Sequence, residues 1–339
     1  MVSAGLFVAL AAVLAFTPVN FVAWAPGQTY DVLGAVDGKP IIQISGIPTH
    51  PVTGQLRLTT VSVTRADSRL SLPGAMLDYL LPNHHVLPRE SVYPVGQTLE
   101  QATQQGSAQM TASQQGATVA ALRAAGVAVQ ENPVVSSVVV GGPSYQVVKV
   151  GDIIETVDNA SVATRTDVVN AVRKHKVGET VILGVDRDGL KMQLQLVTGP
   201  SADDRTVPQI GLTLSSAFRY APKVTFNLDP AVQGPSGGLI FALGIYDLLS
   251  QKDLAHGRVV AGTGQIDASG AVSAISGVQE KLRAAQDVNA QYFLVPAANC
   301  SDVTGLRTSV SVVKVTSLED AISSLEMLDA DPGAAVPRC

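Results

Sequence analysis

The sequence is poor in the residue types that build metal sites and disulfide-rich modules. Its 339 residues include two cysteines, Cys300 and Cys339, and five scattered histidines with no His-Glu-x-x-His pair. Two cysteines are too few for a Cys-rich zinc module or a disulfide scaffold. We therefore expect neither a metal site nor a cofactor, and the pattern leaves open whether the two cysteines pair.

Charge is also scarce. Charged residues make up 15% of the chain, the net charge is −5, and the longest basic cluster runs only from Arg173 to Lys176. This pattern does not favour binding to a phosphate backbone, so nucleic acid is not an expected partner. The single Gly-Lys pair, Gly38-Lys39, precedes Pro40, so there is no Gly-x-x-x-x-Gly-Lys-Ser/Thr loop and no expected nucleotide.

The first charged side chain is Asp31, and the residues before it are almost all apolar. A run of this length predicts a transmembrane helix over residues 1–25. A cleaved signal peptide is the alternative, because Ala23-Trp24-Ala25 has the small-x-small pattern of a cleavage site. Pro26 disfavours cleavage, since proline lacks the N–H that an extended protease cleft binds. We expect a retained single-pass anchor.

Beyond this run, 46% hydrophobic residues are enough for about two domains, each with its own core. Short β-branched segments between residues 28 and 66 predict strands, and residues 97–125 predict a helix stopped by Gly126. Val-rich strands then follow up to residue 186. One helix, Asp167–His175, interrupts them, and Thr164 stands three residues ahead in a capping-box arrangement.

The stretch Val148-Lys149-Val150-Gly151-Asp152-Ile153-Ile154 and the five residues after it resemble the signature of PDZ domains. The resemblance covers about residues 120–199. PDZ domains bind an extended peptide end as an added strand. It therefore implies a groove between a strand and a helix, formed by Gly126, Val127, Ala128, Val129, Val168 and Val172. Each valine taken singly fits a place in the core equally well.

A candidate nucleophile stands in the turn Gly234-Pro235-Ser236-Gly237-Gly238, directly before a strongly apolar helical stretch. The free N–H groups at a helix N-terminus can stabilise an oxyanion there, although a capping serine is the commoner reason for this arrangement. The Gly-x-Ser-x-Gly elbow of α/β-hydrolases needs a later histidine, and only His256 follows. A trypsin-like scheme would use an upstream histidine and aspartate, and proteases of that kind carry a PDZ domain after the protease domain, whereas here the order is reversed. Both histidine-dependent schemes therefore fit poorly, which favours a base other than histidine.

Residues 276–288 supply a candidate base. Ser276 and Gln279 suggest a capping box, and Val278, Leu282, Ala285 and Val288 then form one apolar stripe that includes Lys281, with Gln279, Glu280, Arg283, Gln286 and Asp287 on the opposite side. A lysine directed at a core loses its proton more easily, and a neutral lysine can accept the proton of a serine. The alternative is a lysine whose stem covers apolar surface while its amine reaches water.

Four segments in order resemble the motifs of the Lon-type serine protease domain: Gly234–Gly238, Ala261–Ile266, Gly277–Ala285 and Phe293–Pro296. The resemblance covers roughly residues 205–325. It implies that Ser236 is the nucleophile, Lys281 the general base, and Thr263 the threonine that positions the amine, with Ser236 and Gly237 amides at the oxyanion. The sequence departs from the family at Gly237, where alanine is usual, and at Gln265, where glutamate is usual.

The combination of motifs resembles the membrane-anchored PDZ/Lon-like serine proteases of Gram-positive bacteria, the YlbL-like family. The resemblance implies an α+β fold in which a Lon-type proteolytic domain carries an inserted PDZ domain after a transmembrane helix. The expected parts are the anchor 1–25, the first half of the Lon-like domain 26–119, PDZ 120–200, the Lon-like protease domain 201–328 and a tail 329–339.

The expected function is an ATP-independent serine endopeptidase in the cell membrane, with its catalytic domain outside the cytoplasm and unfolded or small proteins as substrates. By resemblance it also self-associates into a homo-oligomer. Two alternatives remain: a non-catalytic PDZ scaffold with a degenerate protease domain, and a tail-specific PDZ peptidase, to which the motif order is poorly suited.

Overall fold

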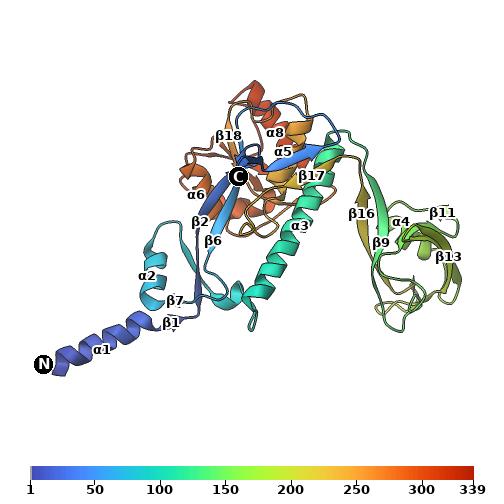
Figure 1. The fold of residues 1–339 in the computed structure, drawn as a ribbon, viewed down its shortest axis with the longest axis horizontal. Helices are drawn as coiled ribbons and strands as arrows, with labels where there is room; N and C mark the ends of the chain where they lie inside the picture. Colours follow the sequence, from blue (N-terminus) through green and yellow to red (C-terminus); the bar gives the residue numbers. More distant parts are fainter. Residues whose placement is uncertain (1) are drawn as a thin grey trace. The chain divides into compact units, whose positions relative to one another are not determined.

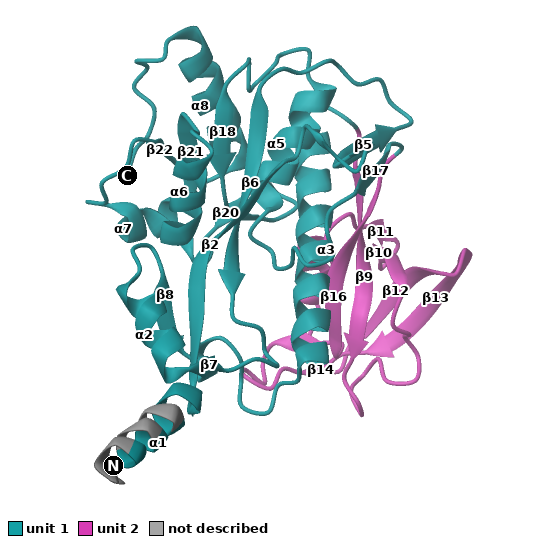
Figure 2. Ribbon diagram, turned by 60° about the vertical axis from the view of Figure 1, so that its left-hand side comes forward, with its two compact units in different colours: residues 1–127, 221–339 teal, residues 128–220 magenta. Residues whose placement is uncertain are grey.

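The computed structural model describes residues 2–339, which form two compact units (Figure 2). Unit 1 comprises residues 1–127 and 221–339, and unit 2 comprises residues 128–220. Unit 2 therefore lies within the sequence of unit 1, between its two halves. This unit starts and ends later than the expected PDZ segment 120–200, because the long helix before it continues to Ala124 and a further strand follows at residues 212–219.

Unit 1 is built on a six-stranded sheet with the order β22-β21-β18-β6-β2-β8 (Figure 1). Its strands are β2 (Phe21–Asp31), β6 (Gln55–Val63), β8 (His85–Pro88), β18 (Val259–Gly262), β21 (Tyr292–Pro296) and β22 (Ser311–Val315). Strands β6, β18, β21 and β22 run parallel, whereas β2 is antiparallel to both β6 and β8. The N-terminal half thus supplies three strands of the sheet that the C-terminal half completes.

Helices cover both faces of this sheet, as alternating side chains show. Val260 and Leu294 belong to the core that contains α5 (Gly238–Leu249) and α8 (Leu318–Ala330). Their neighbours Ala261, Phe293 and Val295 belong to a second core with α6 (Val278–Asp287). Because successive strand residues point to opposite faces, such apolar runs are typical of a strand buried on both sides. In Figure 1, α6 lies on one side of β2, β6 and β18, and α5 and α8 lie on the other.

The remaining elements of unit 1 include the long helix α3, which packs against α5. They are α1 (Val2–Phe16), β1 (Pro18–Val19), β3 (Ala35–Val36), β4 (Lys39–Pro40), β5 (Ile42–Ser45), β7 (Leu70–Ser71), α2 (Leu72–Leu80), η1 (Arg89–Ser91), α3 (Leu99–Ala124), β17 (Lys223–Phe226), β19 (Gln265–Ile266), β20 (Val272–Ser273), η2 (Ala297–Asn299) and α7 (Cys300–Val303). As the sequence predicts, α3 stops just before Gly126, whose φ of 74° suits glycine and lets the Val127 amide donate to the Leu122 carbonyl.

The expected helix over residues 1–25 is wrong in its extent. Helix α1 ends at Phe16, and residues 21–25 already belong to β2, where they pair with β6 and β8. Within residues 2–339, no helix has both the length and the apolar character needed to cross a membrane. Met1, the first residue of the predicted segment, lies outside the described residues.

Unit 2 is a twisted antiparallel sheet with one helix across it. The strand order is β13-β12-β10-β9-β16, with β11 beside β10. The elements are β9 (Gln130–Val138), β10 (Ile153–Val157), β11 (Ala160–Ser161), α4 (Arg165–Val172), β12 (Thr180–Arg187), β13 (Leu190–Val197), β14 (Gly199–Pro200), β15 (Pro208–Gln209) and β16 (Leu212–Arg219). The predicted capping box is present, because Thr164 accepts from the Asp167 amide and Asp167 from the Thr164 amide.

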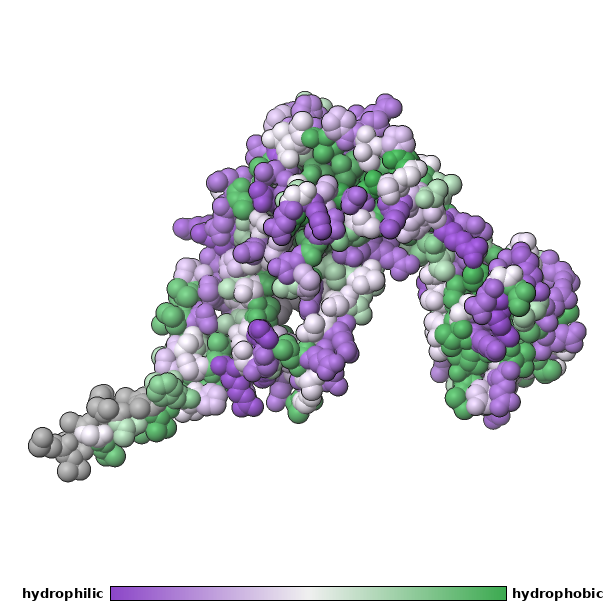
Figure 3. All heavy atoms as spheres, in the orientation of Figure 1, coloured by the Kyte–Doolittle hydropathy of each residue, from purple (hydrophilic) through white to green (hydrophobic). Residues whose placement is uncertain are grey.

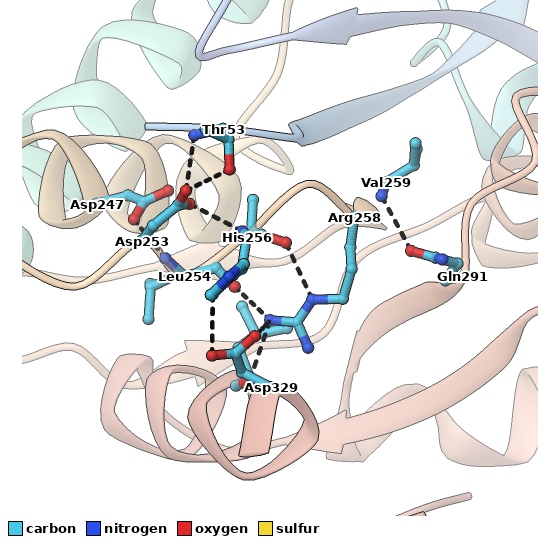
Figure 4. A network of polar contacts seen from close by, with 11 residues as sticks. Thr53, Asp247, Asp253, Leu254, His256, Arg258, Val259, Gln291 and Asp329 are labelled. Carbon is cyan, nitrogen blue, oxygen red and sulfur yellow. Dashed lines mark hydrogen bonds and ion pairs between the residues drawn. The ribbon is translucent and has the colours of Figure 1, made fainter. Parts of the chain in front are cut away.

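Polar contacts tie the chain between α5 and β18 to distant parts of unit 1 (Figure 4). The Asp253 carboxylate accepts from the Thr53 amide at 2.9 Å, and Arg258 donates to the carbonyls of Leu254 and Ala255. Asp247 is fully buried, and burial raises its pKa to about 6. These contacts fix the position of the chain directly before β18, one of the strands that lead to the site described below.

A disulfide between Cys300 and Cys339 attaches the end of the chain to α7. The pairing was left open by the sequence. The segment before Cys339 also follows β22, since the Lys314 amide donates to the Pro337 carbonyl at 2.9 Å and Arg338 donates to Ser311 at 2.7 Å. The disulfide thus closes a loop of 39 residues around the edge of the sheet.

We predict that replacing both cysteines by serine destabilises unit 1. Closing a loop of this length restricts the unfolded chain by about 4 kcal/mol in the chain-entropy model. Denaturant unfolding should show a lower free energy of unfolding for the double variant and no change for Ser301→Ala, an exposed neighbour. Equal stability of the parent and the double variant under oxidising conditions would contradict the prediction.

Candidate active site

Ser236 lies in the turn that leads into α5, one residue before the N-cap Gly237. The turn is held from three directions. The Ser236 carbonyl accepts from the Gly264 amide at 2.8 Å, the Pro235 carbonyl accepts from the Ser113 hydroxyl at 2.8 Å, and the Gly234 amide donates to the Gly106 carbonyl. Two of these partners come from α3, so the N-terminal half of unit 1 fixes the position of the serine.

The two glycines after Ser236 are required by close packing. A Cβ on Gly237 would lie 2.9 Å from side-chain atoms of Leu58 and Phe241. One on Gly238 would lie 2.7 Å from the Ser113 hydroxyl. These spacings are shorter than carbon contacts allow, so the glycine at 237, where the Lon family usually has alanine, fits the tighter packing of this turn.

The backbone around Ser236 offers free donors. Among residues 2–339, the amides of Ser236 and Gly237 donate to no protein acceptor, whereas the next amides, of Gly238 and Leu239, bond to the carbonyls of Pro235 and Gly264. Free N–H groups at the positive end of a helix suit a developing negative charge. The geometry is thus compatible with the expected oxyanion role of Ser236 and Gly237.

Lys281 lies in the first turn of α6 and is only 3% exposed. The helix begins at Gly277, whose left-handed backbone (φ 71°) lets α6 lie directly on β2 and β6. A Cβ there would lie 2.6 Å from Val61. Gly277 is the N-cap and no side chain caps the helix, so the capping box expected for Ser276 and Gln279 is wrong.

The surroundings of Lys281 lower the pKa of its amine. Burial lowers the pKa of Lys281 to about 7, and the negative charge of Glu280 opposes this shift. The expectation that Glu280 lies on the polar, exposed side of α6 is wrong: it is 2% exposed, and one oxygen lies 2.6 Å from Nδ1 of His85 on β8. A buried carboxylate needs such a partner, which helical periodicity does not predict.

Thr263 connects the lysine to the serine. Lys281 Nζ donates to Thr263 Oγ1 at 3.2 Å, and Thr263 Oγ1 donates to the Ser236 carbonyl at 3.1 Å. The three expected residues therefore meet, brought together by the end of β18, the start of α5 and the start of α6. Within residues 2–339 there is no direct hydrogen bond from Lys281 Nζ to Ser236 Oγ, so the link runs through the fully buried Thr263.

Gln265, where the Lon family usually has glutamate, starts β19 and is exposed. Ser113, Glu280 and His85 were not among the expected site residues. No local pattern identifies Ser113 or His85, because each acts on a partner more than 100 residues away in the sequence.

The structure divides the residues expected for the peptide groove between the two units. Gly126 and Val127 belong to unit 1, and Ala128 and Val129 precede β9. A groove of about 390 Å³ instead lies between α4 and the chain of residues 207–214, and Val168 and Val172 form part of its lining. The same valines are 1% and 5% exposed and belong to the core of unit 2, as the alternative interpretation expects.

Comparison with protein families matches two parts of the chain. The model of the PDZ domain matches residues 99–198, and that of the Lon protease (S16) C-terminal proteolytic domain matches residues 230–326. The chain joins a PDZ domain to a Lon-type proteolytic domain. The second match contains Ser236, Thr263 and Lys281, and both domains lie in the order that the sequence motifs predict.

Known relatives match over short stretches. The Lon protease of Mesomycoplasma hyopneumoniae (strain 232) is 36% identical over 80 residues, which are 24% of this chain and 9% of that protein. Among solved structures, the PDZ domains of SdrC-like proteins from Listeria innocua and Listeria monocytogenes are 20% and 24% identical, each over 24% of this chain and over 92% and 85% of theirs, both with a TM-score of 0.23. The chain thus spans only about a tenth of the length of this Lon protease.

We predict that Thr263→Val slows the reaction of Ser236 with a fluorophosphonate. The variant keeps the shape but removes the acceptor of Lys281 Nζ and the donor to Ser236, and an unpaired buried polar group costs about 1–3 kcal/mol. Labelling should slow by roughly tenfold or more. The matched control is Thr59→Val, which removes another buried hydroxyl, bonded to the Gly262 carbonyl at 3.0 Å. Equal labelling rates of the two variants would contradict a role for Thr263 in the site.

Proposed function

We propose that this protein is an ATP-independent serine endopeptidase in which Ser236 is the nucleophile and Lys281 the general base. The observation that carries the proposal is the buried Lys281 amine, linked through Thr263 to the turn that holds Ser236. The family match supports a peptidase of the Lon type. No catalytic histidine is needed, since a lysine with a pKa of about 7 is a competent base at neutral pH.

The proposed reaction is acyl transfer. Neutral Lys281 accepts the Ser236 proton as Ser236 Oγ attacks the carbonyl carbon of the substrate peptide, and the amides of Ser236 and Gly237 bind the oxyanion. The resulting ammonium of Lys281 gives its proton to the leaving amine. Water then attacks the acyl-enzyme with Lys281 again as the base, which restores Ser236.

The substrates are unfolded or small proteins, because the sequence has no phosphate-binding loop with which to drive unfolding. The PDZ domain supplies a second point of attachment. It binds an extended peptide end beside a sheet edge and thereby recruits the substrate or controls its access.

Degradation of casein, which is largely unfolded, tests this proposal. We predict that the parent protein cleaves casein equally well with and without ATP, that Ser236→Ala abolishes cleavage, and that Ser323→Ala, an exposed serine on α8, has no effect. Loss of the nucleophile removes the covalent route and leaves at most a small residual rate. An active Ser236→Ala variant would contradict the role of Ser236 as the nucleophile. A parent that cleaves nothing would leave the chain as a PDZ scaffold.

A second prediction concerns Glu280, whose negative charge raises the pKa of Lys281 against the larger effect of burial. Glu280→Gln removes that charge, so the pKa of Lys281 should fall further below 7. Activity requires the neutral amine and rises with pH through this pKa. The acid limb of kcat/KM should therefore move to lower pH in Glu280→Gln and stay in place in Glu319→Gln, an exposed control on α8. An acid limb that stays in place or moves to higher pH would contradict this role of Glu280.

We also propose that the protein is attached to a membrane through α1, with its catalytic domain outside the cytoplasm. Helix α1 has no charged residue, and the side chains of Leu6 and Phe16 are 71% and 84% exposed. Helix α2, which contacts α1, exposes Tyr79 and Leu80 by 76% and 75%. Figure 3 shows green, hydrophobic residues on the surface of this end of unit 1. So much exposed apolar surface on adjacent helices suits contact with lipid. The disulfide supports an oxidising compartment.

Flotation with phospholipid vesicles tests the attachment. We predict that the full chain floats with vesicles, that deletion of residues 2–16 abolishes flotation, and that Leu80→Asp weakens it. Leu306→Asp, an exposed leucine outside both helices, serves as the control. A full chain that remains in the unbound fraction would contradict membrane attachment and would leave the proposed peptidase untouched.

A further inference from the structure

The groove of unit 2 has the geometry of a site for an added strand. Its floor is formed by β16, the edge strand of the sheet, which pairs with β9 along one side only. Within the described residues of unit 2, no strand occupies the other side of β16. Helix α4 forms the facing wall with Val168, Val169 and Val172. Val169 is 41% exposed, so apolar surface is open to an incoming side chain.

Two arginines stand at the ends of this wall. Arg165 is the first residue of α4 and Arg173 its C-cap, and both line the groove and are exposed. Neither side chain has a hydrogen-bond or ion-pair partner within residues 2–339. Eight residues of helix separate them by about 12 Å along the axis. An extended peptide covers the same distance with three to four residues.

No negative charge in the groove offsets the two guanidinium groups, because its lining contains no aspartate or glutamate. Two of the acidic groups close in sequence are already engaged, and a third, Asp203, is not part of the lining. The Asp167 carboxylate accepts from the amides of Ala163 and Thr164, and the Asp204 carboxylate accepts from the amide and hydroxyl of Thr206. These hydrogen bonds hold the pKa of both carboxyls below the usual range. The groove thus combines an apolar wall and a sheet edge with two unpaired positive charges.

We propose that this groove selects extended peptides that carry acidic side chains beside an apolar residue, with Arg165 and Arg173 as the residues that determine the preference. The proposal rests on the peptide-binding role given to the PDZ domain above and names the class of sequence that it takes. The peptide pairs with the free edge of β16, its apolar side chain packs against Val169, and carboxylates three to four residues apart meet the two arginines.

Fluorescence anisotropy tests the preference with three labelled decapeptides. All three end in the same apolar residue with a free carboxylate, and their preceding residues are rich in glutamate, alanine or lysine. Full-length protein carrying Ser236→Ala is used, so that the probes stay intact. Because an exposed charge pair contributes roughly 0.2–1 kcal/mol, we expect the glutamate peptide to bind roughly tenfold more tightly than the lysine peptide in low salt. The difference should shrink in 0.5 M salt.

Charge reversal at each arginine measures its contribution to the peptide preference. Arg165→Glu and Arg173→Glu should each reduce the preference for the glutamate peptide, and the double variant should favour the lysine peptide. Arg219→Glu, at the far end of β16 and outside the groove, makes the same change of charge and should leave the preference intact. Circular dichroism of each variant shows that unit 2 remains folded.

The outcomes separate this inference from the function on which it rests. Equal binding of the three peptides, or an equal effect of Arg219→Glu, overturns the acidic preference and leaves peptide binding intact. Failure of all three peptides to bind overturns both. Because the readout is binding to a protein without its nucleophile, neither result depends on whether the chain is a peptidase.

Discussion

The structure of unit 1 keeps one amine, Lys281 Nζ, out of water, and the chemistry of the site depends on this burial. In the unfolded chain the amine carries a proton at pH 7, whereas the folded chain lowers its pKa to about 7. A shift of this size opposes folding by about 5 kcal/mol at low pH and less as the pH rises, because the unfolded chain binds the proton more tightly. The two apolar cores on either side of the sheet must offset that cost.

The position of the amine is fixed by the backbone more than by polar contacts. Gly277 allows α6 to start close to β2 and β6, and the tight turn of Gly237 and Gly238 brings α5 to the other side of the same sheet. Thr263, at the end of β18, lies between them and bonds to both. The N-terminal half contributes β2, β6 and the two contacts of α3, so the site requires both segments that flank unit 2.

The sequence predicts those parts of the site that follow from local pattern. The stripe of α6 indicates that Lys281 faces a core, the glycine turn indicates an exposed serine at a helix start, and Gly126 ends α3 where expected. Glu280 was placed wrongly, because helical periodicity takes no account of a partner such as His85 on a strand 195 residues away. The groove beside β16 was not predicted, for a related reason. Strand β16 follows the other strands of unit 2 in sequence but joins the sheet beside β9, the first of them, and this pairing has no local signal.

The most direct test is an NMR titration of the Lys281 side chain in protein carrying Ser236→Ala, with selective isotope labelling of lysine and Lys281→Arg to assign the resonance. The Lys281 resonance should titrate with a midpoint near 7, well below the roughly 10.4 of a lysine in a model peptide. A midpoint near 10 would mean that the amine is charged at neutral pH. Lys281 could then not act as the general base of Ser236.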